Sequence, residues 1–300
     1  FSYGWFFQNP QMSYLYTNPN FWIEGAGASN LVGNADIDAE RTVMYEIGLQ
    51  QQLTNELFMH LTGFYRDIRD WIGTGEPIDT YKGMTYYKYV NKDHAAAKGI
   101  TLTAGYRLNK LAINLDYTYM TAKGTSSNPQ DAYYDALAQR APRVQMINLN
   151  WDQRQTINTV FSYSNRGWLT SLIGSINSGL PYTPSFARGE VSGSGTFVGL
   201  RENSERRPLT YNLDLRLGRN INIGSIRAQL FCNVTNLLDT RNALNIYSDT
   251  GQADYTLQGI NQVDRAGTPD IEISNVDEYF TRPGNFTPPR FIQFGLRVSK

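Results

Sequence analysis

Hydrophobic and polar positions alternate along the final segment of the chain, from Arg290 to Lys300. The two alternating sets are Ile292, Phe294, Leu296 and Val298 on one side, and Gln293, Gly295, Arg297 and Ser299 on the other. Successive side chains of a β-strand point to opposite faces of its sheet. The pattern therefore predicts a strand with one apolar face and one polar face.

The same two-residue period recurs upstream, from Tyr211 to Gly218 and from Ile226 to Thr235. A soluble β-sandwich also alternates, but its polar face meets bulk water and it rarely needs repeated strands of about ten residues. Strands of this length, joined in turn by short and long connections, are typical of a transmembrane β-barrel.

Turn residues and hydrophobic periods together predict about ten strands, joined by two kinds of connection. The predicted short connections are Thr54–Asn55, Leu108–Lys110, Asn165–Gly167 and Asn220–Gly224. The predicted long connections are Asn9–Glu40, Gly73–Thr85, Gly124–Gln153, Leu180–Pro208 and Leu237–Pro289. Strict alternation of the two kinds predicts an all-β, antiparallel up-and-down transmembrane β-barrel with short periplasmic turns and long outer loops. The first strand, Phe1–Gln8, then runs outward, and the C-terminus lies on the periplasmic side.

A membrane sheet of about ten strands must close on itself or belong to a larger barrel, because hydrocarbon does not tolerate unpaired strand edges. No domain boundary, solenoid repeat or low-complexity tract interrupts the sequence. Residues 1–300 are therefore interpreted as a single β-barrel portion. The chain begins at Phe1 without an initiator methionine or signal peptide, so we expect a mature or truncated product.

The amino-acid composition argues against several classes of protein. The 27 basic and 27 acidic residues give a net charge of zero, which disfavours nucleic acid as a partner. Mean hydropathy is -0.44 and no apolar run reaches about 18 residues, which excludes a helical membrane protein. A β-barrel is compatible with this low mean hydropathy and with the absence of a long apolar run, because half of the side chains of each strand face a polar lumen. The 20 tyrosines outnumber the 14 phenylalanines, which suits rings at a membrane interface, although a tyrosine-rich soluble β-protein is an alternative.

Side chains suited to catalysis or metal binding are scarce. Cys232 is the only cysteine, which excludes an intrachain disulfide, and it is interpreted as a small lipid-facing side chain. His60, expected to face the lumen, and His94, expected partway along a strand, are the only histidines. Neither lies in a recognisable motif, so we predict no enzyme activity, no catalytic residue, no cofactor and no metal centre.

Several segments carry, in order, residues that resemble a known family. GNADIDAERTVMYEIGL begins at Gly33 and LTGFYRDIRD begins at Leu61. KGITL from Lys98, SGLPYTP from Ser178, FCNVTNLLD from Phe231 and PRFIQFGLRV from Pro289 follow in the same order. These segments resemble the "GNPDLKPE…YE-G", "FY-DI-D", "G-E-L", "SG-PYTP", "V-NLLD" and closing strands of TonB-dependent outer-membrane receptors.

The resemblance spans almost the whole chain and implies a 22-stranded barrel filled by an N-terminal plug, which draws energy from the inner membrane through TonB. This chain then corresponds to the C-terminal part of the barrel, about the last ten strands, in the bacterial outer membrane. Plug and TonB-contact segments fall outside it. Two residues depart from the family pattern. Thr101 stands where Glu is usual, and the chain ends on Lys300, whereas the family usually ends on an aromatic residue. Either the true end is missing or the assembly signal is atypical.

Ligand-binding residues are expected on the outer loops, because binding residues concentrate on loops carried by a rigid scaffold. Taken singly, each candidate is more often a solvated loop residue. The candidates are Arg66, Arg69, Trp71, Tyr81, Tyr133, Tyr134, Arg188 and Arg201.

Two further groups of polar residues stand out in the sequence. Oxygen-bearing side chains cluster at the end of the first long connection, at Asn34, Asp36, Asp38 and Glu40. They could hold Ca²⁺, although the capping of turns in a solvated loop is the favoured interpretation. In the predicted lumen, Asp214, Arg216 and Arg227 are expected to pair with one another or with a plug.

The resemblance implies TonB-dependent active uptake of a scarce solute. Implied partners are outer-membrane lipid, the TonB complex, a small solute, glycan or peptide ligand, and a surface lipoprotein as a further candidate. Two alternatives stay open: a self-contained ten-stranded outer-membrane hydrolase, and a surface binding barrel that transports nothing. Siderophore, vitamin, peptide and glycan receptors share these loop residue types, so the solute class also stays open.

Overall fold

The computed structural model describes residues 1–23, 30–137, 145–185, 202–224, 226–256 and 282–299. Its main sheet has 13 strands, and three of these, β2, β5 and β8, lie beside the main path of ten. The main path runs β1 (Ser2–Gln8), β3 (Glu40–Gln52), β4 (Leu57–Thr74), β6 (Thr85–Leu108), β7 (Leu111–Gly124), β9 (Gln155–Asn165), β10 (Trp168–Asn177), β13 (Thr210–Ile223), β14 (Ile226–Thr235) and β15 (Phe291–Ser299). The prediction of an antiparallel all-β barrel segment with about ten strands is thereby confirmed.

Short elements occupy the long connections between these strands. β2 (Leu31–Val32) and β5 (Ile78–Asp79) pair with β6, and β8 (Ile147–Asn148) pairs with β7. β11 (Pro181–Tyr182) and β12 (Glu205–Arg206) form a separate two-stranded sheet. The helices are α1 (Met12–Tyr16), α2 (Asp131–Leu137) and the 3-10 helix η2 (Pro283–Asn285). Within the described ranges, no helix has the length and apolar character needed to cross a membrane.

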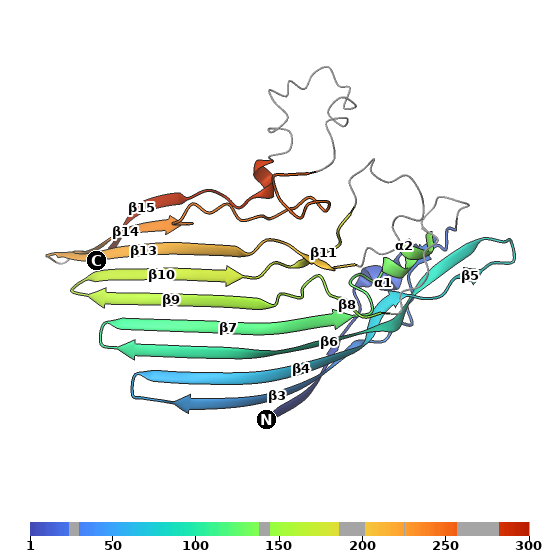
Figure 1. Ribbon diagram of the computed structural model, residues 1–300, viewed down its shortest axis with the longest axis horizontal. Coiled ribbons are helices and arrows are strands. Elements are labelled where there is room, and N and C mark those ends of the chain that lie inside the picture. Colours follow the sequence, from blue (N-terminus) through green and yellow to red (C-terminus); the bar gives the residue numbers. More distant parts are fainter. Residues whose placement is uncertain (24–29, 138–144, 186–201, 225, 257–281, 300) are drawn as a thin grey trace, which may run out of the picture. The chain divides into compact units, whose positions relative to one another are not determined.

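Short turns and long connections alternate along the chain, as the sequence predicts. Figure 1 shows β9 and β10 as neighbours joined by one such turn. That turn consists of Arg166 and Gly167, whose φ angles are 46° and 83°. Two consecutive residues with positive φ are typical of the type I′ turn, whose twist matches that of the flanking strands. The turn thus fixes the register of the hairpin.

One predicted turn, Asn220–Gly224, starts later than expected. Asn220 and Asn222 were expected to lie in a connection, but they continue β13 and pair with Gln229 and Arg227 of β14. The cross-strand ladder runs on because these polar side chains alternate with apolar ones and keep the two-residue period. The chain instead reverses beside Gly224, whose φ is 62°.

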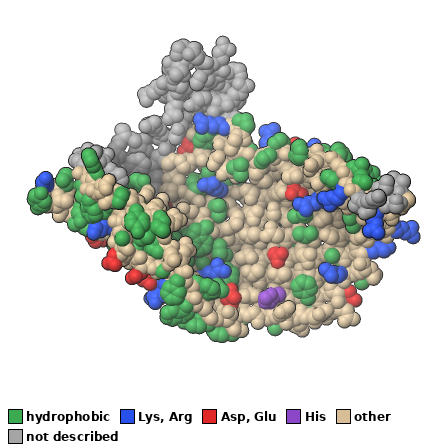
Figure 2. Space-filling model, turned by 180° about the vertical axis from the view of Figure 1, so that it is seen from behind, with side chains coloured by type: hydrophobic (Ala, Val, Ile, Leu, Met, Phe, Trp, Pro, Cys, Tyr) green, Lys and Arg blue, Asp and Glu red, His purple; other side chains and the backbone are tan. Residues whose placement is uncertain are grey.

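Cross-strand register separates an apolar face from a polar face. On the apolar face, Cys232 lies opposite Leu217 on one side and Phe294 on the other. On the polar face, Arg216 lies opposite Asn233. Figure 2 shows a broad area of polar side chains and backbone with isolated charged groups. Phe294 is 77% exposed despite its apolar ring, and an uncovered apolar face of this kind is what contact with lipid requires.

The chain divides into two compact units. The first unit comprises Phe1–Ile47, Gly63–Gly99 and Thr121–Asp152. The second unit comprises Gly48–Thr62, Ile100–Met120 and Gln153–Lys300. The first unit holds the first three long connections and both buried hydrophobic clusters. The second unit holds most of the short-turn hairpins and the strands from β9 onward.

An aromatic–cation pair marks the short-turn end of the apolar face in the second unit. Trp168 of β10 lies opposite Arg219 of β13, and the Arg219 guanidinium carbon is 4.9 Å from the centre of the Trp168 ring. Amphipathic rings and long basic side chains prefer the boundary between hydrocarbon and water. The pair therefore places one edge of the lipid-facing band at this end of the sheet.

Candidate functional site

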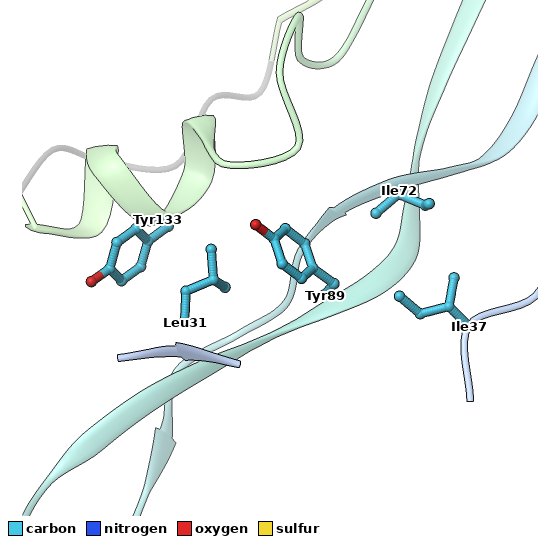
Figure 3. Close-up of a cluster of buried hydrophobic side chains, with 5 residues drawn as sticks. All are labelled: Leu31, Ile37, Ile72, Tyr89 and Tyr133. Carbon is cyan, nitrogen blue, oxygen red and sulfur yellow. The ribbon is translucent and has the colours of Figure 1, made fainter. Parts of the chain in front are cut away.

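A buried cluster joins two long connections of the first unit to strands β4 and β6. It comprises Leu31 of β2, Ile37, Ile72 of β4, Tyr89 of β6 and Tyr133 of α2 (Figure 3). All five are at most 9% exposed. Burial of large side chains from loops far apart in sequence is the feature of a folded core. These connections therefore form one ordered platform on the ends of β4 and β6.

Aromatic rings extend this platform. The Tyr14 ring centre lies 5.0 Å from that of Tyr89, and the Tyr87 ring meets Tyr133 edge-on at 5.3 Å. Such tilted and edge-to-face contacts are favourable beyond the area that they bury. Gln130 donates a hydrogen bond from Nε2 to the Tyr89 hydroxyl at 2.9 Å, which fixes the start of α2 against the sheet.

A second buried cluster lies in the same unit. It is formed by Ala95, Ala97, Ala122 and Leu149, with Ile68 and Trp71 packed against it. The small alanine side chains let neighbouring segments approach closely. The Asp152 carboxylate accepts a hydrogen bond from the Ala122 backbone N–H at 2.7 Å, which anchors the chain after β8.

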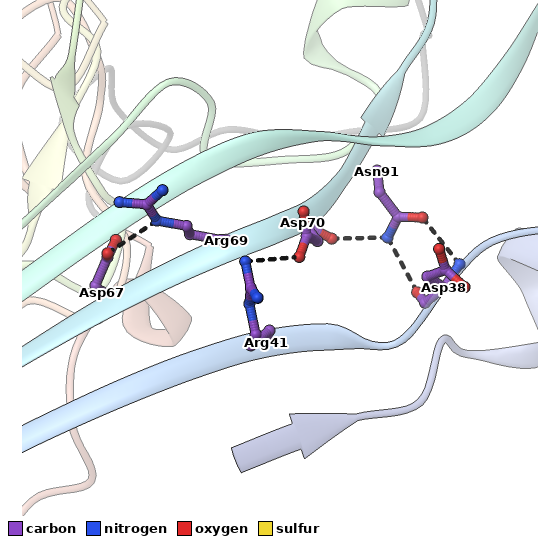
Figure 4. A network of polar contacts seen from close by, with 6 residues as sticks. All are labelled: Asp38, Arg41, Asp67, Arg69, Asp70 and Asn91. Carbon is purple, nitrogen blue, oxygen red and sulfur yellow. Dashed lines mark hydrogen bonds and ion pairs between the residues drawn. The ribbon is translucent and has the colours of Figure 1, made fainter. Parts of the chain in front are cut away.

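A polar network borders the platform (Figure 4). The Arg41 guanidinium lies 3.5 Å from the Asp70 carboxylate, and Arg69 donates to Asp67 at 2.9 Å. Asp70 has a φ of 57°, so its backbone leaves the regular strand geometry. Asn91 donates from Nδ2 to the Asp70 carbonyl at 2.7 Å and thereby satisfies this displaced group.

The polar side chains that precede β3 support the backbone. Asn34 accepts a hydrogen bond from the Asp36 N–H at 3.1 Å, which is a local side-chain turn. Asn91 accepts from the Asp38 N–H at 2.9 Å, and Glu40 accepts from the Ile72 N–H at 3.2 Å. In the described part of the chain, no three His, Cys, Asp or Glu side chains gather closely enough to hold a metal ion.

The predicted ligand-binding residues fall into different environments. Tyr81 is 94% exposed at the tip between β5 and β6, with the Lys82 ammonium 5.6 Å from its ring centre. Tyr134 is 55% exposed and its hydroxyl donates to Gln130. Arg66 is exposed and stacks on the Phe64 ring at 5.2 Å. Tyr81, Tyr134 and Arg66 thus present reachable side chains.

Three other predicted ligand-binding residues are packed or paired with neighbouring side chains. Tyr133 is 4% exposed inside the platform, and its hydroxyl accepts a hydrogen bond from the Asn30 N–H at 3.1 Å. Trp71 packs on the alanine-rich cluster, and Arg69 is engaged by Asp67. The structure brings Tyr133 and Tyr134 together, with ring centres 5.7 Å apart. Arg188 and Arg201 lie outside the described residues.

Sequence reasoning missed the part that β6 plays in the platform. Tyr87, Tyr89 and Asn91 share one face of β6 and reach the buried cluster and the polar network. Their two-residue spacing is visible in the sequence. Tyr86 lies on the opposite face of β6, where the centre of its ring is 5.5 Å from that of Phe21. Alternation alone predicts the face of each residue but not which loop covers it.

A separate set of loop contacts lies in the second unit. Tyr182 of β11 faces Gly251, where any Cβ atom would lie 2.4 Å from the tyrosine oxygen. Burial raises the pKa of the Tyr182 hydroxyl, and the carboxylates of Glu205 and Asp249 raise it further. The Ser185 and Ser248 hydroxyl oxygens are 2.7 Å apart. The segment that resembles the family's "SG-PYTP" loop thus packs against the last long connection.

Among the described residues, the lumen charges form no ion pair with one another, while their pairing with a plug stays a prediction. The Asp214 carboxylate accepts hydrogen bonds from Asn212 Nδ2 at 2.8 Å and from the Asn236 N–H at 2.9 Å. Among the described residues, no ion pair joins Asp214 to Arg216 or Arg227. Neutral amide donors near Asp214 satisfy its carboxylate and leave the two arginines available for other partners.

The two histidines lie on different strands, His60 on β4 and His94 on β6. His60 Nε2 lies 3.1 Å from the Thr62 hydroxyl oxygen on the same face of β4. The His94 backbone N–H donates to the Thr125 hydroxyl at 3.2 Å. Within the described ranges, each histidine is held by a threonine of a strand or its connection. The predicted place of His94 partway along β6 is confirmed.

An antiparallel sheet with one uncovered apolar face, one polar face and ordered long connections defines the class of membrane β-barrels. Residues 1–237 match the family described as TonB dependent receptor-like, beta-barrel, and the chain belongs to this family. It is a portion of an outer-membrane receptor barrel, as the sequence predicts. No curated protein matches the chain at a significant level.

Solved structures show the same fold. The outer membrane transporter YddB from Escherichia coli is 13% identical with a TM-score of 0.54, over 75% of this chain and 32% of that one. The copper transporter OprC is 16% identical with a TM-score of 0.51, over 99% of this chain and 35% of that chain. The FpvAI–pyocin S2 complex is 13% identical with a TM-score of 0.52, over 98% of this chain and 30% of that chain. The chain therefore spans between 30% and 35% of the length of these three proteins.

Proposed function

We propose that these residues are the C-terminal barrel portion of a receptor that takes up a scarce solute across the outer membrane, with energy delivered through TonB. The family match over residues 1–237 carries the proposal. A plug and further N-terminal strands would complete the protein, and TonB would act through the plug. A surface lipoprotein is a further proposed partner.

We place ligand contact on the platform of the first unit. Tyr134 is exposed next to Tyr133 of the cluster, and Tyr81 and Arg66 are exposed elsewhere in the first unit. Aromatic rings with a polar tip, held on an ordered scaffold, recognise ligands at a low entropic cost. Tyr134→Ala should weaken solute binding about tenfold, because stacking contacts of this kind contribute on the order of 1 kcal/mol or more.

The test is uptake by cells that carry the full-length gene. Radiolabelled ferric siderophores, cobalamin, copper, oligosaccharides and peptides are offered one by one to wild-type, gene-deleted and tonB-deleted cells. We expect one solute to accumulate in the periplasm of wild-type cells only. Binding without accumulation would favour a surface binding barrel, and a chemically altered solute would favour a hydrolase. Accumulation that persists without TonB would contradict the proposal.

A further inference from the structure

A hollow of about 540 Å³ lies on the polar face of the second unit. It spans the ends of β6, β7, β9 and β10 next to their short turns, the middle of β13, and residues 229–233 of β14. Its volume falls within the range of sites that enclose small ligands, about 300 to 1,000 Å³. The hollow is therefore large enough for a molecule or a side-chain group beyond a single water.

Small side chains create this hollow. One row of the sheet runs from Ala112 through Ser162 and Ser171 to Arg216 and Asn233. The first three residues of the row have short side chains, and the two serine oxygens lie 3.5 Å apart. The longer Arg216 side chain, further along the row, also lines the hollow. Neighbouring positions of the sheet thus form a floor that can donate hydrogen bonds.

The charge around the hollow has one sign. Arg107, Lys110 and Arg216 line it, and no carboxylate is among its lining residues. Among the described residues, no ion pair joins these three cations to an acid. Like charges that converge on one concave surface raise the local concentration of anions. The carboxylate nearest along β13, Asp214, is already held by Asn212 and Asn236.

We propose that this hollow is a binding site for a group with anionic oxygens, a carboxylate or a phosphate. The arginine guanidinium groups match such oxygens with paired N–H donors, and Lys110 supplies a point charge. The serine hydroxyls and the amide of Asn233 complete the donor set. The anion is either a solute in the lumen or an acidic side chain of a polypeptide that lies there. The proposal concerns this face alone and stands independently of solute uptake.

The first measurement uses citrate and inorganic phosphate as probes. Their binding to the purified full-length receptor is followed by calorimetry at constant ionic strength, with heat-modifiable migration as the check on folding. Arg216→Gln should weaken citrate binding about tenfold, as expected for the loss of one charge-assisted hydrogen bond. Arg219→Gln is the matched control, because it removes the same charge from the same strand on the opposite face. The control should bind citrate as the wild type does.

The second measurement detects a polypeptide occupant. A zero-length carbodiimide couples Lys110 to any carboxylate in contact with its ammonium group, and mass spectrometry identifies the partner. A cross-link that Arg216→Gln reduces and Arg219→Gln leaves unchanged would assign the site to an acidic side chain. Lys110→Arg keeps the charge and should remove the cross-linked peptide.

Citrate binding or a Lys110 cross-link supports the anion site and identifies its source, provided that Arg216→Gln weakens it and Arg219→Gln does not. Equal weakening by both substitutions would overturn it, because it would reduce the effect to net charge. Absence of both citrate binding and the cross-link in the folded wild type would overturn it as well.

Discussion

At the scale of single residues, Asn236 explains why the segment that resembles "V-NLLD" has its sequence. Its side chain accepts a hydrogen bond from the Thr240 N–H at 2.8 Å and donates to the Thr240 and Pro288 carbonyls at 3.0 and 3.1 Å. Asp239 accepts from the Arg290 N–H at 2.8 Å. These bonds hold the two ends of the last long connection together where β14 ends and β15 begins. The segment is therefore structural.

We predict that Asn236→Gly destabilises the protein by about 2 to 3 kcal/mol, because three hydrogen bonds of a buried side chain are lost. Glycine tolerates the φ of 55° at this position, so the loss reports the side chain alone. Thermal unfolding of the purified receptor measures it. Asn245→Gly, on an exposed amide with one bond of 3.5 Å, is the control and should change stability far less.

A glycine under an aromatic ring gives a second prediction. A Cβ atom at Gly105 would lie 2.1 Å from Phe58 Cε1. Gly105→Ala should cost about 1 to 3 kcal/mol through overpacking, and the additional change Phe58→Leu should recover part of it. Gly63→Ala is the control, since its nearest neighbour would be 3.6 Å away. Equal loss at Gly105 and Gly63, measured by unfolding temperature, would rule out the ring contact as the cause.

Some residue environments could be predicted from the sequence and others could not. Alternation places Leu296 on the apolar face and Arg216 on the polar face, because a strand allows only two orientations. The burial of Tyr133 depends on how α2 packs against Tyr87 and Leu31, which are distant in sequence. No local pattern contains that packing. Asp214 does not pair with Arg216 or Arg227 for a similar reason, because Asn212 and the backbone of Asn236 donate hydrogen bonds to its carboxylate.

At the scale of elements, the apolar face of β10 covers most of the apolar band of a membrane barrel, because a strand tilted by about 40° rises about three quarters of its own length. On β10 it extends from Trp168 to Ile176, which at about 3.3 Å per residue is about 26 Å along the strand. Barrels carry an apolar band about 25 Å tall between aromatic girdles, on tilted strands. β6 is 24 residues long, more than twice the need of a single crossing. The first half of β6, in the first unit, carries Tyr87 and Tyr89 of the platform.

The two faces of β15 should respond differently to a charge. Leu296 lies opposite Leu230 on the apolar face, while Gln293 lies opposite Asn233 on the polar face. Leu296→Arg should destabilise the barrel by about 2 to 4 kcal/mol near the midplane, and Gln293→Arg should be mild. The amount of heat-modifiable receptor in the outer membrane measures both. Equal losses would refute the assignment of the faces.

At the scale of the whole molecule, the strand order has two ends. Along the main path of the described sheet, β1 pairs only with β3, and β15 pairs only with β14. Unpaired strand edges are not tolerated in hydrocarbon, because each exposed N–H and C=O group costs several kcal/mol there. The sheet therefore needs further strands, or closure between its own ends, to be stable in a membrane.

We predict that residues 1–300, expressed alone behind a signal peptide, aggregate or are degraded. Closure by about ten strands would narrow the barrel and crowd large side chains of the polar face, such as Arg107 and Phe231. Co-expression with the upstream part of the gene should restore heat-modifiable migration and protease protection. A monodisperse, heat-modifiable species formed by the fragment alone would contradict the prediction and would revive the hydrolase alternative.

The buried cluster of Leu31, Ile72, Tyr89 and Tyr133 also bears on how a ligand is captured. A loop that orders only on contact loses conformational entropy at that moment, which slows capture and weakens affinity. Here the loss occurs during folding, so a ligand that binds at Tyr134, as we propose, would meet a surface of fixed shape. Association should then approach the rate of rigid partners, with selectivity set by fit rather than by adaptation.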